Sequence, residues 1–379
     1  VLKLLNMTEP DFVFFGEKDW QQLVIIKQLV EDFNLPGKIK SVATVRDQDG
    51  LAFSSRNQYL NKNQKKQSVA FPKILKKAQS ELRVNKVLNL KKITTELESN
   101  GLQVEYLELI DPDTLESMDD WKKNGLLASC VRCGSTRLID HIFLMKRNPI
   151  IAIDGPAGAG KSTVTKKVAN RLGLLYLDTG AMYRAISWLI INEQINLQNI
   201  EKVNLLLENL NLEFETRTES EQRIMLNGND ITNMIRSPEV TSIVSEVASK
   251  KYIRDHLVAE QKKIGEKGGI VAEGRDIGTA VFSDADLKIF LTATTTERAR
   301  RRALDLETQG FHVPRLSELE EQIQNRDNVD INREISPLKK AIDAQEIISD
   351  GMNIEEVVNL IIDLFQNKVP QEVWPSLDK

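Results

Sequence analysis

The stretch I-I-A-I-D-G-P-A-G-A-G-K-S at residues 150–162 joins a short apolar run to a complete G-x-x-x-x-G-K-[ST] phosphate loop. The apolar run is typical of a buried strand, and the apolar spacing of residues 163–172, which Gly173 ends, indicates a helix. Glycines in such a turn let backbone N–H groups face phosphate oxygens. Lys161 would then reach the β- and γ-phosphates, and the Ser162 hydroxyl would ligate Mg²⁺. This order of elements favours a nucleotide-binding α/β fold over a chance glycine-rich turn.

Composition limits the class of protein. The 379 residues are enough for two or three domains, and 41% hydrophobic with 28% charged residues is typical of a globular protein. No apolar run approaches the ~18 residues that span a bilayer, and no signal peptide is visible. Two cysteines suggest the reducing cytoplasm, and a net charge of −4 argues against non-specific binding of nucleic acid. We therefore predict a cytoplasmic protein that acts on small molecules.

A domain boundary is expected at the short polar segment that ends in Pro149, directly before the phosphate-loop strand. Its residues are Lys146, Arg147 and Asn148. This boundary gives two modules, 1–147 and 149–368. Residues 369–379, with two prolines, are expected to form an irregular tail.

Charged and hydroxyl side chains follow other predicted strands of the second module. D-T-G-A-M-Y-R at 178–184 follows an apolar run, and Thr179 and Arg184 would either hold a second phosphate or form an ordinary N-cap and a solvated arginine. G-R-D-I-G-T at 274–279 places Arg275 and Asp276 at the end of another strand, a typical ligand-facing position.

Two later segments are rich in arginine. The helix expected over residues 297–306 carries Arg298, Arg300, Arg301 and Arg302, which suit a lid over polyphosphate or, alternatively, a solvated face. Arg326, Asp330 and Arg333 stand at i, i+4 and i+7 on a helix that Pro337 is expected to end. By itself this stripe is also consistent with a surface ladder of ion pairs.

Together these residues resemble the bacterial cytidylate kinase family over roughly residues 149–365. The resemblance rests on I-D-G-P-A-G-A-G-K-S at 153–162, D-T-G-A-M-Y-R at 178–184, G-R-D-I-G-T at 274–279 and R-D-N-V-D-I-N-R at 326–333. It implies transfer of the ATP γ-phosphoryl group to CMP or dCMP, with Mg²⁺, in a parallel-sheet nucleoside-monophosphate-kinase fold. The acceptor is already a phosphate anion and needs no base, so we interpret His141, His256 and His312 as structural.

The resemblance also implies roles for individual residues. ATP would be bound by Gly155, Gly158, Ala159, Gly160, Lys161, Ser162 and Thr163. The CMP phosphate would be held by Thr179, Arg184 and Arg275, the cytosine by Ser245, Arg254 and Asp276, and the nucleotide from the lid side by Arg326, Asp330 and Arg333. The catalytic residues would be Lys161, Arg184, Arg275 and Arg301. Residues 212–265 resemble the insert that closes over CMP, and Ser162 stands where some relatives carry glycine.

The first module has phosphate-binding candidates of its own. An apolar run at 12–15 precedes G-E-K-D-W-Q-Q at 16–22, which predicts a strand followed by a helix. Lys18 and Asp19 at this helix start would bind phosphate and Mg²⁺ or form an exposed first turn. D-G at 49–50 predicts a hairpin turn, and S-S-R-N at 54–57 offers two hydroxyls and an arginine to phosphate oxygens.

These segments, with T-R-L-I-D at 136–140, resemble the later part of the pantothenate synthetase family. That family condenses pantoate with β-alanine through a pantoyl-adenylate. The resemblance implies ATP contacts by Gly16, Glu17, Lys18, Asp19, Val45, Phe53, Ser54, Ser55 and Arg56, and a pantoate contact by Gln22. The family's His-x-Gly-His motif has no counterpart here, so the chain resembles a fused, cyanobacterial-type pantothenate synthetase–cytidylate kinase with an incomplete, nucleotidyltransferase-like first module. We therefore expect it to make no pantothenate by itself.

Two alternatives stay open. The kinase could accept AMP or UMP, which only the proposed base-reading residues exclude. The first module could instead be a non-catalytic interaction module, and a homodimer would use this module. The lone C-x-x-C of Cys130 and Cys133 indicates core cysteines, because no second pair or nearby histidine completes a metal site.

Overall fold

The computed structural model describes residues 1–85, 87–118, 124–145, 147–218, 221–308, 310 and 312–374. The chain forms two compact units. The first unit comprises residues 1–148 together with Val369–Trp374, and the second comprises Pro149–Lys368. Of the expected boundary segment, Lys146 lies outside the described residues. Within the described ranges, no helix combines the length and the apolar character that crossing a membrane requires.

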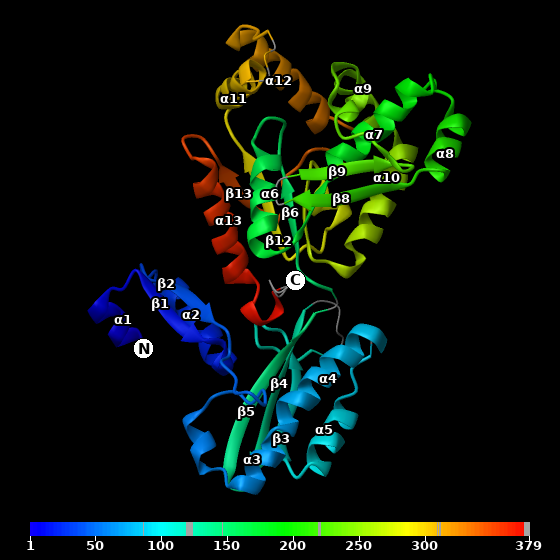
Figure 1. Ribbon diagram of the computed structural model, residues 1–379. Coiled ribbons are helices and arrows are strands. Elements are labelled where there is room, and N and C mark those ends of the chain that lie inside the picture. The colour runs from blue at the N-terminus through cyan, green and yellow to red at the C-terminus, as the bar shows by residue number, and fades with distance from the viewer. Residues whose placement is uncertain are drawn as a thin grey trace. The chain divides into compact units, whose positions relative to one another are not determined.

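The second unit is built on a five-stranded parallel sheet in the order β13-β12-β6-β11-β7 (Figure 1). Its strands are β6 (Ile150–Asp154), β7 (Leu175–Asp178), β11 (Ile270–Gly274), β12 (Leu287–Thr292) and β13 (Gln345–Ile348). From the central β6 the chain first builds one side of the sheet and then the other. Ligands bind at such a switch point, beyond the carboxyl ends of the strands. The phosphate loop leaves β6 at this point.

The central strands are buried along their length, as expected for a parallel sheet with helices on its faces. Helix α6 (Lys161–Leu172) follows the phosphate loop, and Gly173 ends it with a φ of 64°, which glycine adopts readily. Helices α6 and α13 (Ile354–Lys368) pack against each other and against the sheet (Figure 1). The parallel α/β fold expected from the phosphate-loop strand is confirmed.

A helical and antiparallel region lies between β7 and β11 in the chain. It contains α7 (Thr179–Asn192), α8 (Ile200–Glu208), an antiparallel sheet of β8 (Leu212–Thr218), β9 (Glu221–Leu226) and β10 (Asn229–Asp230), then α9 (Pro238–Ser249) and α10 (Lys251–Ile264). Apolar residues of α7, α8, α9 and α10 form a common core. After β12 come α11 (Thr295–Thr308) and α12 (Leu316–Ile331), which pack on each other.

The first unit contains an antiparallel sheet in the order β3-β4-β5. Its strands are β3 (Gln103–Ile110), β4 (Gly125–Cys133) and β5 (Thr136–Leu144). Helices α4 (Ala70–Asn85) and α5 (Leu90–Ser99) contact β5 and β3 and share a core with the sheet (Figure 1). The short helix α3 (Lys62–Ser68) starts at a capping box between Asn61 and Gln64. Both cysteines are buried free thiols on β4, which confirms that they are core residues.

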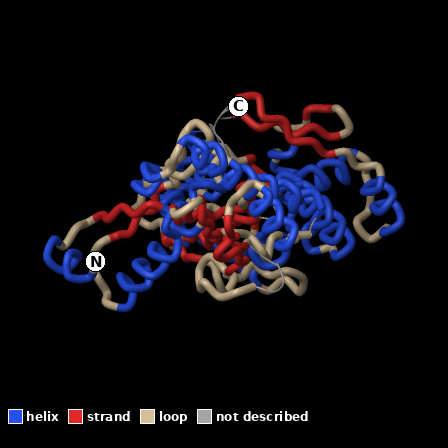
Figure 2. The backbone as a smooth tube through the Cα atoms, turned by 90° about the horizontal axis from the view of Figure 1, so that it is seen from below, coloured by secondary structure: helices blue, strands red, loops and turns tan. Residues whose placement is uncertain are grey.

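The N-terminal part of this unit is a parallel strand pair with helices beside it (Figure 2). It comprises α1 (Leu2–Thr8), β1 (Phe12–Gly16), the 3₁₀ turn η1 (Glu17–Asp19), α2 (Trp20–Asp32) and β2 (Lys38–Val42). Parallel strands are usually buried on both faces. Here Phe14 on β1 is 68% exposed, and Phe12 is also exposed. Two phenylalanine side chains of β1 are thus exposed in this unit.

Three local expectations differ from the structure. The turn at Asp49 and Gly50 forms, but its arms meet only in an isolated bridge between Arg46 and Ala52, because β2 ends at Val42. Helix α12 ends at Ile331, so Arg333 lies beyond the helix on which a stripe was expected. In the expected tail, Gln371–Val373 form a 3₁₀ turn, η6, that belongs to the first unit, while residues 375–379 lie outside the described residues.

Candidate functional site

The phosphate loop of the second unit has the backbone that its glycines permit. Gly155, Gly158 and Gly160 have φ angles of 152°, 78° and 85°. A side chain at Gly155 would also collide with the carbonyl oxygen of Leu291, because its Cβ would lie 1.9 Å from that atom. Any other residue at these positions would therefore strain the loop. Its N–H groups and the start of α6 provide the surface that phosphate requires.

Lys161, the first residue of α6, is only 6% exposed, and its Nζ donates to the carbonyl oxygen of Pro156 at 2.6 Å. Burial and, next, the positive charge of Arg275 lower the pKa of Lys161 to about 7. Glu273 and Asp154 act in the opposite direction. The lysine is thus held inside the loop in an environment that favours its charged form only weakly until an anion binds.

Glu273, at the end of β11, joins the phosphate loop to the neighbouring strand. Its Oε2 accepts from Ser162 Oγ at 3.0 Å, and its other oxygen accepts from the Tyr176 hydroxyl. Burial raises the pKa of Glu273, while Lys161 lowers it. The sequence prediction did not include Glu273 in the site. The sequence feature that could have identified it is an acidic residue at the end of an apolar strand next to the phosphate-loop strand.

A hydroxyl and a carboxylate are oxygen ligands of the kind that Mg²⁺ prefers, so Ser162 and Glu273 fit a magnesium ion. Among the described residues, the structure contains no group of three or more histidine, cysteine or carboxylate side chains that could hold a metal by themselves. Mg²⁺ usually keeps several waters and takes substrate phosphates as its other ligands. The donor set therefore suits an ion that arrives with a nucleotide.

Asp154, the last residue of β6, positions the loop that follows β11. Its carboxylate accepts from the backbone N–H groups of Ile277 and Gly278 at 2.8 and 2.7 Å. Burial raises its pKa to about 6, although these two hydrogen bonds act against the rise. The bonds fix the two residues that directly follow Arg275 and Asp276 in the chain.

The two arginines predicted to bind the acceptor phosphate, Arg184 and Arg275, lie near Arg326, which was predicted to bind the nucleotide from the lid side. Arg275 Nε is 2.9 Å from Asp330 Oδ2, and Arg184 Nη2 is 2.8 Å from Asp178 Oδ2. The pKa of Arg326 is lowered, first by burial and then by the positive charge of Arg275, with Arg184 in the same direction. Positive charges that lie close enough to lower a neighbouring pKa form an environment suited to an anion.

The remaining acceptor residues are distributed around this cluster. Thr179, at the start of α7, donates to the backbone carbonyl of Glu273 at 2.7 Å, which ties it to the end of β11. Asp330 is engaged by Arg275 and does not form a ladder with Arg326 on the helix surface. Arg333 donates to the backbone carbonyl of Ser336 at 3.1 Å. Arg333, the last residue of the expected helical stripe, therefore makes its contact in the loop after α12.

A buried ion pair connects α10 to the turn after β11. Arg254 is 2% exposed and its Nη2 donates to the Asp276 carboxylate, while its Nη1 donates to the Ala248 carbonyl at 3.0 Å. The guanidinium also lies 5.4 Å from the centre of the Tyr183 ring. Burial and then Arg254 lower the pKa of Arg333, so that residue lies near the pair. Ser245, the third predicted cytosine reader, is a half-buried residue of α9.

The four arginines of α11 do not act alike. Arg298 is buried, donates to the Ala157 carbonyl at 3.1 Å and pairs with Asp327 at 2.6 Å. Arg301 donates to the Ser349 carbonyl at 2.8 Å and approaches the Ala159 carbonyl at 3.4 Å. Arg300 and Arg302 are exposed. Two arginines thus contact the phosphate loop, as a nucleotide-binding segment requires, and two face solvent.

In the first unit, the predicted ATP residues fall on two segments. Gly16 ends β1, and Glu17, Lys18 and Asp19 form η1, next to the exposed Gln22 of α2. On the second segment the N–H of Phe53 donates to the Val45 carbonyl at 2.9 Å, and Ser54 Oγ accepts from the Arg56 N–H at 3.3 Å. Ser55 and Arg56 are exposed.

His141 and Arg46 connect these two segments to the β-sheet of the first unit. Arg46 makes a two-point ion pair with Asp140 of β5, at 2.7 and 2.9 Å. Burial lowers the pKa of His141 below the ordinary value, while the charge of Asp140 and a hydrogen bond with the Lys18 backbone act in the opposite direction. A neutral, packed imidazole agrees with the structural role expected for His141.

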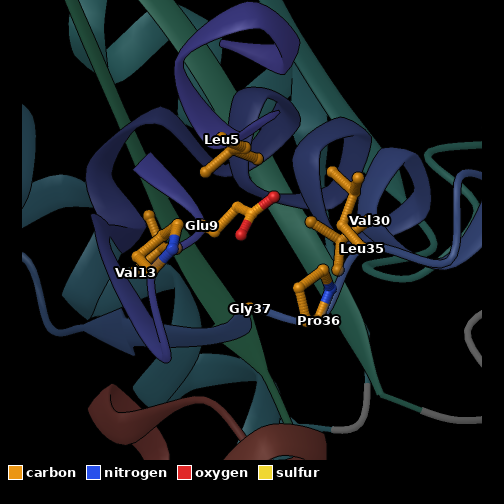
Figure 3. A pocket seen from close by; sticks show the side chains of 8 residues that line it. Leu5, Glu9, Val13, Val30, Leu35, Pro36 and Gly37 are labelled. Carbon is orange, nitrogen blue, oxygen red and sulfur yellow. The ribbon is translucent and has the colours of Figure 1, made fainter. Parts of the chain in front are cut away.

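A small apolar pocket lies elsewhere in the first unit. It is lined by residues of α1, β1, α2 and the following turn, among them Leu5, Val13 and Leu35. Figure 3 shows the Glu9 side chain pointing toward its middle. Since none of the predicted site residues lines it, the pocket has no part in the candidate sites.

Two family models match the chain. The cytidylate kinase model matches residues 151–367, and the pantoate-beta-alanine ligase model matches residues 1–143. The bifunctional pantoate ligase/cytidylate kinase of Prochlorococcus marinus strain SARG is 58% identical over 99% of this chain and 73% of that protein. Its counterpart from strain MIT 9303 is 54% identical over 99% of this chain and 77% of that protein.

Solved structures give weaker likenesses. The pantoate-beta-alanine ligase of Thermus thermophilus is 30% identical, with a TM-score of 0.34, over 37% of this chain and 52% of that one. The Francisella tularensis ligase, complexed with β-γ ATP and β-alanine, is 32% identical with a TM-score of 0.30, over 38% of this chain and 47% of that one. The chain thus spans about half the length of these solved ligases. The sequence matches confirm both expected resemblances: the chain belongs to the bifunctional pantoate ligase/cytidylate kinase family.

Proposed function

We propose that residues 149–368 transfer the γ-phosphoryl group of ATP to CMP or dCMP. The observation that carries the proposal is a phosphate loop with a buried lysine beside a cluster of arginines and a buried Arg254–Asp276 pair, all within one unit. The phosphate loop and its lysine suit a polyphosphate donor. The arginine cluster and the Arg254–Asp276 pair suit an acceptor that has a phosphate and a polar base. Family membership supports the same reaction.

The mechanism needs positive charge and positioning more than covalent work by the protein. Lys161 and Arg301 would stabilise the negative charge that develops on the transferred group, and Arg184 and Arg275 would hold the acceptor phosphate in line. Mg²⁺, held by Ser162 and Glu273 and brought by ATP, would neutralise charge on the β- and γ-phosphates. An attacking phosphate oxygen is already an anion, so no side chain has to remove a proton.

The kinase should prefer CMP to AMP, because Ser245, Arg254 and Asp276 are proposed to hydrogen-bond the cytosine edge. A base that leaves a desolvated polar group unpaired costs about 1–3 kcal/mol per group, or roughly 5- to 150-fold in kcat/KM. Coupled-assay turnover with CMP, dCMP, UMP and AMP measures the preference. Equal kcat/KM for AMP and CMP would contradict the assignment of these residues to cytosine recognition and would support a kinase for another monophosphate.

We further propose that the first unit contributes the later part of a pantoate ligase site, with ATP contacts on η1 and on residues 45–56. The support is the family match and the exposed hydroxyl and cationic side chains on these segments. The alternative is a non-catalytic interaction module. A homodimer through this unit remains a prediction that sedimentation velocity checks.

The ligase proposal predicts ATP binding that does not depend on the kinase site. In a Lys161→Ala background, ATP binding that persists should be lost when Lys18 and Arg56 are replaced by alanine, because these cations are proposed to face its phosphates. Calorimetry measures the loss, and Lys3→Ala on α1 is the matched surface control. Unchanged ATP binding after both substitutions would favour the non-catalytic module.

A further inference from the structure

The segment that follows α13 packs within the first unit rather than with the helix that precedes it. Pro370 starts the single turn η6, and the side chains of Val369 and Val373 are buried. Trp374 Nε1 donates to the Val369 carbonyl at 2.9 Å, so the turn is closed by its own side chain. The two family models match residues 1–143 and 151–367, so residues 369–374 lie outside both.

Gln371 links the turn after β1 to the chain that leaves β2. Its backbone N–H donates to Glu17 Oε1 at 3.2 Å, and its side-chain oxygen accepts from the Ala43 N–H at 3.0 Å. Glu17 is fully buried, and this burial raises its pKa, while the hydrogen bonds from Gln371 and Ser41 act against the rise. Buried polar groups are stabilised when such partners are present and are costly without them.

Glu372 adds a negative charge beside the two residues that brace this region. Its carboxylate oxygens lie 3.7 Å from Arg46 Nη2 and 4.0 Å from His141 Nε2. Arg46 is already bound to Asp140, and the His141 ring is hydrogen-bonded to the Lys18 backbone. The segment therefore contacts η1 directly through Glu17 and also lies beside His141, which is hydrogen-bonded to the Lys18 backbone of η1.

The segment contacts one of the residues proposed to bind ATP, Glu17, whose side chain is buried. Asp19, Val45, Phe53 and Arg56 remain exposed while Gln371 and Glu372 make these contacts. The contact with Glu17 involves a carboxylate that is already turned away from solvent. This arrangement favours support of the turn over obstruction of the proposed site.

We propose that residues 369–374 are a structural part of the ligase unit, and that Gln371 and Glu372 are positioning residues that hold η1 and Arg46 in place. The segment that follows the last helix of the kinase unit would thus be an element that the ligase unit requires. The inference rests on the proposed ligase function only for what η1 binds. The support itself concerns contacts within the first unit and can be measured without turnover.

Hydrogen–deuterium exchange of the full chain tests the support. In a Gln371→Pro/Glu372→Ala variant, the N–H that donates to Glu17, the side-chain oxygen that accepts from Ala43 and the Glu372 charge are all lost. Amides of residues 12–22 and 38–46 should then exchange about tenfold faster, because local opening becomes easier. Residues 150–172 should exchange as before, and CMP kinase turnover should be unchanged. Lys368→Ala, at an exposed position just before the segment, is the matched control. Unchanged exchange at residues 12–22 and 38–46 would overturn the proposal.

The role of Glu372 in positioning can be separated from general packing by the titration of His141. The charged groups that face this ring are Glu372, Asp140 and Arg46, with the Lys18 backbone as its hydrogen-bond partner. Replacing Glu372 with glutamine should lower the pKa of His141 further, since one negative charge is lost. Glu372→Asp should restore part of the difference. NMR titration of the three histidines measures it, and an unmoved His141 pKa in Glu372→Gln would contradict direct contact.

Discussion

Replacing Lys161 with alanine should lower the kcat of CMP phosphorylation about a thousandfold, because a charge aimed at the transferred group is lost from a water-poor site. The Lys161 amine lies inside the phosphate loop, with the Pro156 carbonyl oxygen as its hydrogen-bond partner at 2.6 Å. A coupled assay of ADP formation gives kcat and KM. Thermal unfolding of the same preparation shows whether the second unit is intact.

Two further variants make the Lys161 result specific. Lys161→Met keeps most of the aliphatic stem and removes the charge, so it should lose as much kcat as alanine does. Lys167→Ala, on the same helix, breaks only a surface pair with Glu355 and should leave kcat unchanged. If a stable Lys161→Ala protein keeps more than about a tenth of kcat, the lysine does not serve the phosphates.

The pKa of Lys161 allows a second, independent test of its contact with the phosphates. Burial and the Arg275 charge lower this pKa to about 7 in the free protein, against an ordinary value of about 10.4. Bound phosphates favour the protonated amine, so ATP binding at pH 8 should take up protons. Calorimetry in two buffers of different ionisation enthalpy measures the uptake, which Lys161→Met should reduce.

The sequence predicted those parts of the second unit in which a single motif determines both the local structure and the phosphate-binding residues. An apolar strand, glycines with positive φ and a helix that starts at Lys161 are local properties, and the structure has all three. Arg275 and Asp276 were predicted at a strand end for the same reason. Their partners, Asp330 and Arg254, lie 55 and 22 residues away in the chain, and no local pattern pairs them.

The residues that sequence reasoning missed or misplaced depend on tertiary contacts. Glu273 looks like the last residue of a buried strand, and only the packing of β11 beside β6 brings it to Ser162. The end of α12 at Ile331 removes Arg333 from the expected stripe, although its spacing is helical. The segment at Gln371 was expected to be irregular because of its prolines, and its contacts with Glu17 connect residues 354 positions apart.

Replacing Asp276 with alanine should both destabilise the second unit and abolish measurable CMP binding. Arg254 is 2% exposed, so its guanidinium would keep only the Ala248 carbonyl and the Tyr183 ring as partners. Breaking a buried ion pair on one side costs about 3–5 kcal/mol, because the remaining charge is uncompensated. Chemical denaturation measures this loss. Lys251→Ala, which breaks an exposed pair on α10, should cost almost nothing.

A double-mutant cycle separates the structural role of this pair from its proposed role in reading cytosine. In Arg254→Leu/Asp276→Ala no charge remains buried, so the double variant should be more stable than Asp276→Ala alone. Its affinity for CMP should stay as low as that of either single variant, while its affinity for ATP should match the parent protein. Calorimetric titration with each nucleotide decides between the roles. If CMP affinity returned along with stability, the pair would be a structural bridge between α10 and the turn after β11, and the cytosine-reading assignment would be wrong.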